Sequence, residues 1–131
     1  MENKYYTPTL DEFYVGFEYE QKHGDKWKSL VFDINYEDSD WNELYHINYC
    51  LAYHSIRVKY LDKEDIESLG FSNYIPPHEY DHTWTLGKFT LKCWFNDTIP
   101  HIRIIGQFVT VFDGNIKNKS ELVKLLKQIG I

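Results

Sequence analysis

Cysteine is scarce in this sequence, and no two cysteines lie close together. Only Cys50 and Cys93 occur among 131 residues, each inside a stretch with strand-like alternation. Disulfide scaffolds and cysteine-based zinc sites need several cysteines at short spacings, so neither is the basis of this fold. We expect both thiols to be reduced and buried.

Long apolar runs are also missing. No stretch approaches the roughly 18 consecutive apolar residues of a membrane-spanning helix. The first residues, Met-Glu-Asn-Lys-Tyr-Tyr, contain neither the basic segment nor the apolar segment of a secretory signal. The sequence therefore predicts a cytoplasmic protein that makes no contact with a membrane.

Basic residues are outnumbered by acidic ones. Fourteen Lys and Arg against twenty Asp and Glu give a net charge of -6, which opposes binding to nucleic acid. The charge is uneven, because residues 1–45 hold eleven acidic residues and four lysines, whereas residues 117–131 hold four lysines and one glutamate. A solvated helix face explains the basic end, and docking of this end on the acidic half of a second copy is the alternative.

Aromatic side chains, in contrast, are abundant. Eight Phe, eleven Tyr and four Trp make up 18% of the chain, and such rings suit either a thin β-rich core or a contact surface. Hydrophobic residues at 43% and charged residues at 26% are typical of a globular protein. The length and the lack of linkers or repeats predict a single domain over residues 1–131.

Strands are predicted wherever apolar and polar residues alternate. In the stretch 88–95, for example, Leu91 and Cys93 fall on one face and Trp94 on the other. The turn residues His23-Gly24-Asp25 predict a hairpin between the first two strands. The predicted strands cover residues 14–20, 27–34, 52–60, 88–95, 102–105 and 108–112, the last two being alternatively one strand bent at a glycine.

Two helices have clear start and stop signals. One runs over 62–70, with Asp62 as its cap and Gly70 at its end. The other is C-terminal and amphipathic, and it begins at Asn118 and ends at Gly130. We predict an α+β fold: a largely antiparallel sheet of five or six strands with one short helix and the C-terminal helix packed on it.

One string matches a catalytic motif. His78-Glu79-Tyr80-Asp81-His82 fits H-E-x-x-H, which in zinc proteases places two imidazoles one helical turn apart. Pro76 and Pro77 precede it and strand-forming residues follow it, so at most one turn of helix fits. The sequence favours a polar loop here, and a zinc-dependent hydrolase remains the alternative. No other catalytic template is present, so we expect no cofactor and no enzymatic activity.

A binding surface is indicated by rings on predicted loops. Several flank the Pro-Pro loop, and others follow an acidic stretch at 35–41; rings in loops serve as contact anchors or fold back over a sheet. Trp94 lies on the face opposite the predicted core, which points to a covered second face or to self-association. The candidate binding residues are Trp41, Tyr45, Tyr74, Tyr80, His82 and Trp84.

The two ends of the chain resemble a known group. The stretch Tyr6-Thr-Pro-Thr-Leu-Asp-Glu-Phe-Tyr-Val-Gly-Phe-Glu-Tyr-Glu20 and the closing stretch 113–131, with Ile-Lys-Asn-Lys-Ser-Glu-Leu at 116–122, are similar to small proteins of gut bacteria and their bacteriophages. The resemblance covers about a quarter of the chain. It implies a phage or mobile-element context and no particular activity.

Together, these observations predict a non-catalytic interaction protein that binds a bacterial protein and inhibits or modulates it. A protein that sequesters a small ligand such as a nucleotide, acting as an oligomer, is the alternative from another class. Both readings use aromatic residues at a surface, and they differ in the chemistry of the partner.

Overall fold

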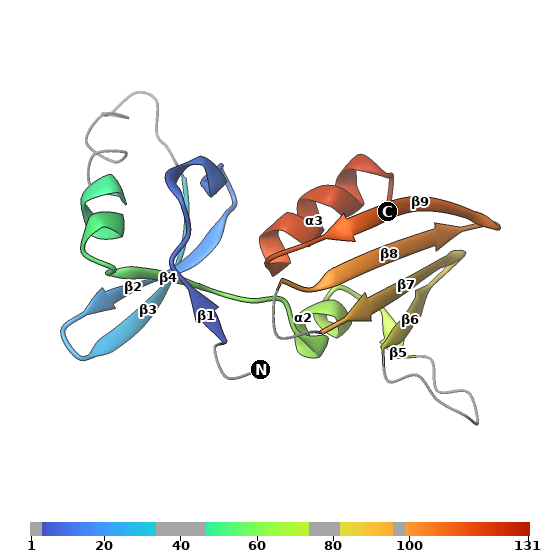
Figure 1. Cartoon of the computed structure of the whole chain (residues 1–131), viewed down its shortest axis with the longest axis horizontal. Coiled ribbons are helices and arrows are strands. Elements are labelled where there is room, and N and C mark those ends of the chain that lie inside the picture. The colour runs from blue at the N-terminus through green and yellow to red at the C-terminus, as the bar shows by residue number, and fades with distance from the viewer. Residues whose placement is uncertain (1–3, 34–46, 74–81, 96–98) are drawn as a thin grey trace. The chain divides into compact units, whose positions relative to one another are not determined.

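The computed structural model describes residues 4–33, 47–73, 82–95 and 99–131. These residues form two compact units, a smaller unit (Asn3–Lys59) and a larger unit built mainly from Tyr60–Ile131. The predicted α+β fold with antiparallel strands and a C-terminal helix is confirmed, although the described residues contain nine strands in two sheets (Figure 1). Whether the two units act as the single predicted domain stays a prediction. No helix among the described residues is long and apolar enough to cross a membrane.

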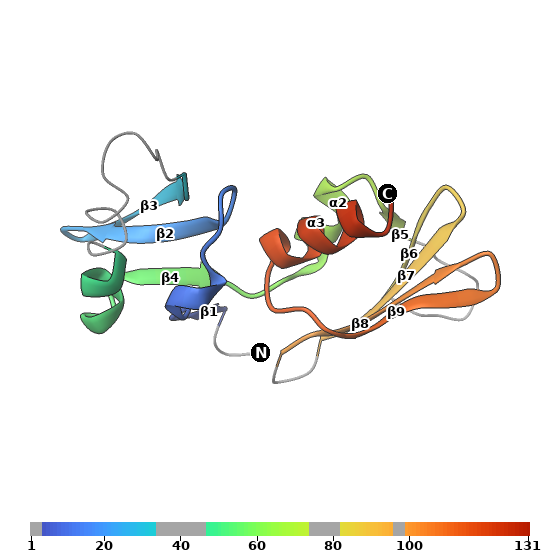
Figure 2. The ribbon, with the colours of Figure 1, turned by 90° about the horizontal axis from the view of Figure 1, so that it is seen from above.

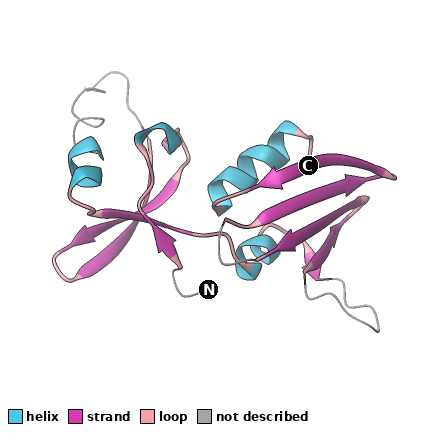
Figure 3. Ribbon diagram, viewed as in Figure 1, coloured by secondary structure: helices cyan, strands magenta, loops and turns pink. Residues whose placement is uncertain are grey.

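The smaller unit contains a four-stranded antiparallel sheet in the order β1-β4-β2-β3. A helical segment over 47–52 precedes β4, the last strand of this unit in the sequence (Figure 3). Rings of Phe13, Phe17 and Phe32 pack in its core with centroids 4.8–5.3 Å from Phe13. The elements are β1 (Tyr5–Tyr6), the 3-10 helix η1 (Leu10–Glu12), β2 (Glu18–His23), β3 (Lys26–Val31) and β4 (Ile56–Lys59).

The predicted hairpin between the first two strands is confirmed. His23 pairs with Lys26 across a two-residue turn, and Gly24 adopts a left-handed φ of +64° that suits it. The predicted strand from residue 14 begins only at Glu18, because Phe17 N–H donates to Tyr14 O at 2.9 Å and closes a turn. A chain turning there cannot continue the strand ladder.

The strand predicted over 52–60 is also shorter than expected. It begins at Ile56, because residues 47–52 are helical and His54 adopts a left-handed φ of +55°. Ser55 N–H donates to Cys50 O at 2.9 Å and His54 N–H to Leu51 O at 3.2 Å. These two bonds form the pattern that ends many helices, with His54 in the position that glycine usually holds.

Arg57, on β4, contacts a side chain from each of the other three strands of the smaller sheet. Its guanidinium carbon lies 3.7 Å from the centroid of the Tyr5 ring and 4.2 Å from that of Trp27. Its Nε donates to Glu20 Oε1 at 2.7 Å. The cation thus stacks between two aromatic rings while it is paired with a carboxylate, an arrangement that stabilises this sheet.

The larger unit is an antiparallel meander in which five strands lie side by side in chain order. Both helices lie on the same side of this sheet (Figure 2). The elements are α2 (Lys63–Ser68), β5 (Ser72–Asn73), β6 (Thr83–Leu86), β7 (Phe89–Trp94), β8 (His101–Gly106), β9 (Val109–Asn115) and α3 (Lys119–Gln128).

Both predicted helices are confirmed with their caps. Asp62 Oδ1 accepts from Asp65 N–H at 2.9 Å at the start of α2, and Asn118 Oδ1 accepts from Glu121 N–H at 2.8 Å at the start of α3. Gly130 ends α3 with a φ of +84°. The core between helices and sheet consists of Leu61, Ile66, Phe71, Trp84, Leu91, Cys93, Ile102, Ile104, Ile116, Leu122 and Leu126.

Candidate functional site

Trp84, one of the predicted binding residues, lies in the core. Its side chain is completely buried, and its indole Nε1 donates to Glu67 Oε2 at 3.2 Å. The pairing of Trp84 with Leu91 places both side chains on the helix-covered face of the sheet. The prediction of Trp84 as a surface residue is therefore wrong, because it is a strand residue of β6 facing the core rather than a loop residue.

His82 is the other predicted binding residue within the described part of the chain. It directly precedes β6, and its ring centroid lies 5.8 Å from that of Trp94. Of the H-E-x-x-H string, only His82 is described. The remaining candidates lie outside the described residues: Trp41, Tyr45, Tyr74 and Tyr80.

The second face of the larger sheet, named here the open face, carries no helix of this unit among the described residues (Figure 2). Strand pairing brings side chains from β6 to β9 into rows across it, since residues that pair directly point to the same face. Trp94 is half-buried there, on the face opposite the buried Leu91 and Cys93, as the alternation predicted. The first two rows are Trp94, His101 and Asn115, followed by Thr83, Lys92, Arg103 and Asp113.

A hydrogen-bonded cluster joins these two rows. His101 Nε2 lies 2.5 Å from Asp113 Oδ1, and His101 Nδ1 lies 3.1 Å from Asn115 Oδ1. Arg103 Nη2 donates to Asp113 Oδ2 at 3.3 Å. The hydrogen bond from His101 and the positive charge of Arg103 hold the pKa of Asp113 below its usual value. The carboxylate is therefore ionised and already engaged by two neighbours.

The open face has a different charge balance from the whole chain. Its two rows carry the cations Lys92 and Arg103 and one carboxylate, Asp113, whereas the chain has a net charge of -6. The Arg103 guanidinium carbon lies 5.7 Å from the centroid of the Trp94 ring. A half-buried indole beside two cations is suited to contact with an aromatic or anionic group.

A second surface lies at the opposite end of the strands, where β8 turns into β9. This surface, named here the hairpin end, consists of Gln107, Phe108, Val109 and Val111. Phe108 is 103% exposed and Val109 62% exposed. Gln107 and Phe108 both have positive φ, +38° and +72°, although neither is a glycine. An aromatic residue at such a φ is strained, and a fully exposed ring gains nothing from burial.

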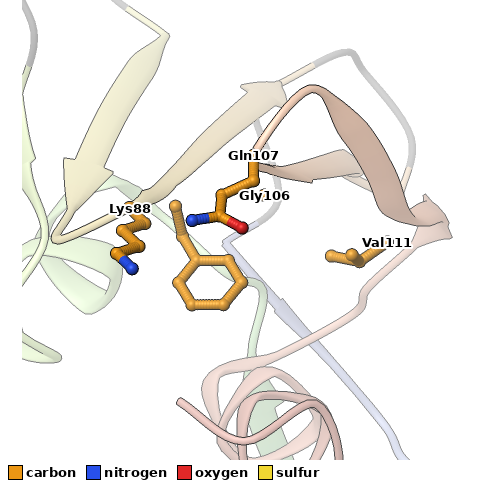
Figure 4. Close-up of a pocket in the computed structure, with 5 residues that line it drawn as sticks. Lys88, Gly106, Gln107 and Val111 are labelled. Atoms are coloured by element: carbon orange, nitrogen blue, oxygen red, sulfur yellow. The ribbon is translucent and has the colours of Figure 1, made fainter.

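A shallow pocket adjoins the hairpin end (Figure 4). Its volume is about 280 Å³, and its lining residues are Lys88, Phe89, Gly106, Gln107 and Val111. The Phe89 ring lies directly over Gly106, where a Cβ would come within 2.9 Å of Phe89 Cε1. Gly106 therefore allows the ring, which forms an apolar wall of the pocket, to pack this close to the backbone.

No group of three or more His, Cys, Asp or Glu residues within 4–33, 47–73, 82–95 and 99–131 is arranged to hold a metal ion. Comparisons with protein-family models, with curated proteins and with solved structures give no match to this chain.

Sequence reasoning found the open face only through Trp94 and missed the hairpin end. The sequence predicts Phe108 as the first residue of a strand, because aromatic residues favour strands and a Gln-Phe pair carries no turn signal. The signal that could have found it is Gly106 between two β-branched runs, which marked a bend without fixing its residues.

Proposed function

We propose that this protein is a non-catalytic interaction protein that binds another protein through the hairpin end. The observation that carries the proposal is Phe108, whose ring is fully exposed on a strained backbone. The exposed apolar ring and the strained backbone both disfavour the folded state of the free protein. Binding of a partner that covers the ring would offset both costs. Exposed aromatic residues beside apolar neighbours are typical anchors of protein interfaces.

The chemistry of this surface supports a partner with an apolar concave site for Phe108. Val109 and Val111 flank the ring on β9, which is an edge strand of its sheet. The pocket beside Phe89 can in turn accept an apolar side chain of the partner, since about 150 Å³ already holds a benzene molecule. Lys88 is the one charged residue that lines the pocket, so little charge has to be desolvated there.

We further propose that the partner is a bacterial protein, which the protein inhibits or modulates in the cytoplasm. The similarity of both chain ends to small proteins of gut bacteria and their bacteriophages supports this setting. Reduced cysteines fit it as well, because Cys50 and Cys93 are buried and no disulfide joins them.

Paired variants of matched exposure test the proposal. The full chain and its Phe108→Ser, Val109→Ser and Val31→Ser variants are used to capture proteins from bacterial lysate, and the affinity of each identified partner is then measured by calorimetry with purified components. Val31 is the control, because it is 59% exposed, like Val109 at 62%, but lies on β3 of the smaller unit. Phe108→Ser should weaken binding by roughly 30-fold or more, the effect of an interface hot spot, and Val31→Ser should not change it.

Equal affinity of the wild type and both hairpin-end variants for every identified partner would contradict the proposal. Sedimentation velocity of the purified chain gives a second check. A dimer that Phe108→Ser dissociates would assign the hairpin end to self-association, and the proposal of a separate partner would then be wrong.

A further inference from the structure

The open face carries a row of aromatic rings at one end of the larger sheet. The Trp94 ring centroid lies 5.8 Å from that of His82 and 5.7 Å from that of His101. The three residues belong to different parts of the chain: the start of β6, the end of β7 and the start of β8. Because Trp94 is half-buried, part of its indole remains available for stacking.

Cationic groups lie directly beside this row. Lys92 and Arg103 pair across β7 and β8, so their side chains emerge next to each other and next to Trp94. The Arg103 side chain is 43% exposed, and its one hydrogen bond within the described residues is the 3.3 Å contact from Nη2 to Asp113. Its Nε is covered and has no partner among the described residues. Of the five donors of a guanidinium, one is bound to Asp113 and the covered Nε cannot reach a ligand, so the three others, on Nη1 and Nη2, remain for an anion.

We propose that the open face binds a free nucleoside monophosphate, with the base stacked at Trp94 and the phosphate held by Arg103 and Lys92. A nucleotide combines the two groups that this face is suited to contact, a flat aromatic ring and a phosphate a few ångströms from it. The positive balance of the two rows complements the phosphate even though the chain as a whole is acidic.

A nucleic acid strand fits this face less well than a single nucleotide. Binding along a strand needs successive stacking rings and a continuous basic track. The open face has the row of rings, but within the described rows it has only the two cations Lys92 and Arg103, which form no continuous basic track, and the net charge of -6 repels a long polyanion. Two neighbouring cations can hold one phosphate group, which favours a single nucleotide over a strand.

The site is independent of the proposed protein-binding surface. Phe89, which lines the pocket at the hairpin end, and Trp94 lie at opposite ends of β7, about 17 Å apart along the strand. They also differ in face, since Phe89 packs against the core under the helices. Failure of one proposal would therefore leave the other standing.

Titration of the full chain with AMP, GMP, CMP and UMP, followed by amide NMR, tests the proposal. At least one of the four should shift the amides of Trp94, His101 and Arg103 and the Trp94 indole signal in a saturable way, and leave Phe108 unchanged. Ribose 5-phosphate and the matching nucleoside serve as probes that lack the base or the phosphate. Each should bind more weakly than the nucleotide.

Variants of the two contact groups give the expected magnitudes. Trp94→Ala should weaken binding roughly 5- to 150-fold, the range for loss of one stacked base. Arg103→Gln should weaken it roughly 10- to 150-fold, the range for loss of a charged hydrogen bond. Trp94→Phe keeps a ring and should bind with intermediate affinity, and Val31→Ser, at an exposed position on β3 of the smaller unit, should bind as the wild type does.

Four results would overturn the proposal. They are no saturable shift with any of the four nucleotides at millimolar concentration, equal binding of ribose 5-phosphate or of the nucleoside, equal affinity of the Arg103→Gln variant, and tighter binding of a ten-nucleotide single strand of dT. Thermal melts and amide spectra of each variant show whether it is folded. If Trp94→Ala does not fold, Trp94→Phe and Arg103→Gln decide the question.

Discussion

Replacing Gln107 and Phe108 with Asn and Gly is expected to stabilise the larger unit while it removes the ring on which partner binding is proposed to depend. Both residues have positive φ, the conformation of a two-residue hairpin turn in which Asn-Gly is the preferred pair. The wild-type turn therefore carries a strain that the variant would relieve.

The size of the gain follows from three contributions. Removing the strain of a left-handed conformation at a residue other than glycine raises the free energy of unfolding by about 1–2 kcal/mol. Glycine at position 108 lowers the free energy of unfolding by about 0.5–1 kcal/mol, because it gives the unfolded chain more conformational freedom. No hydrophobic burial is lost, because Phe108 is 103% exposed. The net gain is about 1 kcal/mol, which raises the melting temperature of a unit of this size by about 4–8 °C.

Thermal and urea unfolding measure this change, and hydrogen exchange of the β7 and β8 amides assigns it to the larger unit. Two control variants separate the effect of the ring on stability from the effect of the backbone conformation. Phe108→Ala removes the ring but keeps a side chain at positive φ, so its stability should stay near that of the wild type. Gly24→Ala introduces a side chain at a φ of +64° in the smaller unit and should lower the free energy of unfolding by about 1 kcal/mol.

An Asn-Gly variant that is no more stable than Phe108→Ala would contradict this prediction. In that case the turn is not strained, and the positive φ of Phe108 does not support a functional role for this residue. If the variant is stabilised and still binds every identified partner as tightly as the wild type, the strain is real but the ring is not the contact group.

Three further predictions concern individual side chains. R57M should lower the free energy of unfolding by about 1–3 kcal/mol in urea titrations, because Glu20 loses its partner and two rings lose their cation. The hydrogen bond from His101 lowers the pKa of Asp113, so its ionised form stabilises the fold above the pKa of the unfolded chain, and this contribution disappears as the pH falls through the lowered pKa. An NMR titration should give that low pKa and a higher one in H101Q. Burial raises the pKa of the Cys93 thiol to about 12, so at pH 8 a thiol reagent should modify it only after unfolding, as followed by mass spectrometry.

Local signals in the sequence were enough to predict most of the larger unit. Alternation placed Leu91 and Cys93 inside and Trp94 outside, because side chains of a strand alternate whatever it pairs with. Capping residues marked α2 and α3, since Asp62 and Asn118 satisfy backbone groups within three residues of themselves. Features that depend on residues close together in the sequence, such as side-chain alternation and helix caps, can therefore be predicted from the sequence.

Features that depend on unusual backbone conformations or on distant residues could not be predicted. His54 ends a helix in the conformation that glycine normally takes, so no stop signal separated residues 47–52 from β4. The cluster of His101, Arg103 and Asp113 arises only from the register of β8 and β9. Register is a property of two strands, and the sequence of either strand alone does not contain it.

The irregularity in β9 has a consequence for solubility. The register of β8 and β9 shifts after Ile104, so Val111 is left without a direct pairing partner between Thr110 and Phe112. A regular edge of seven residues that begins with Val-Thr-Val-Phe would invite further copies to add strand after strand. A bulge breaks the even spacing of backbone donors and acceptors that such growth requires. The edge of β9 is therefore a poorer template for fibre growth than a regular strand of the same length would be.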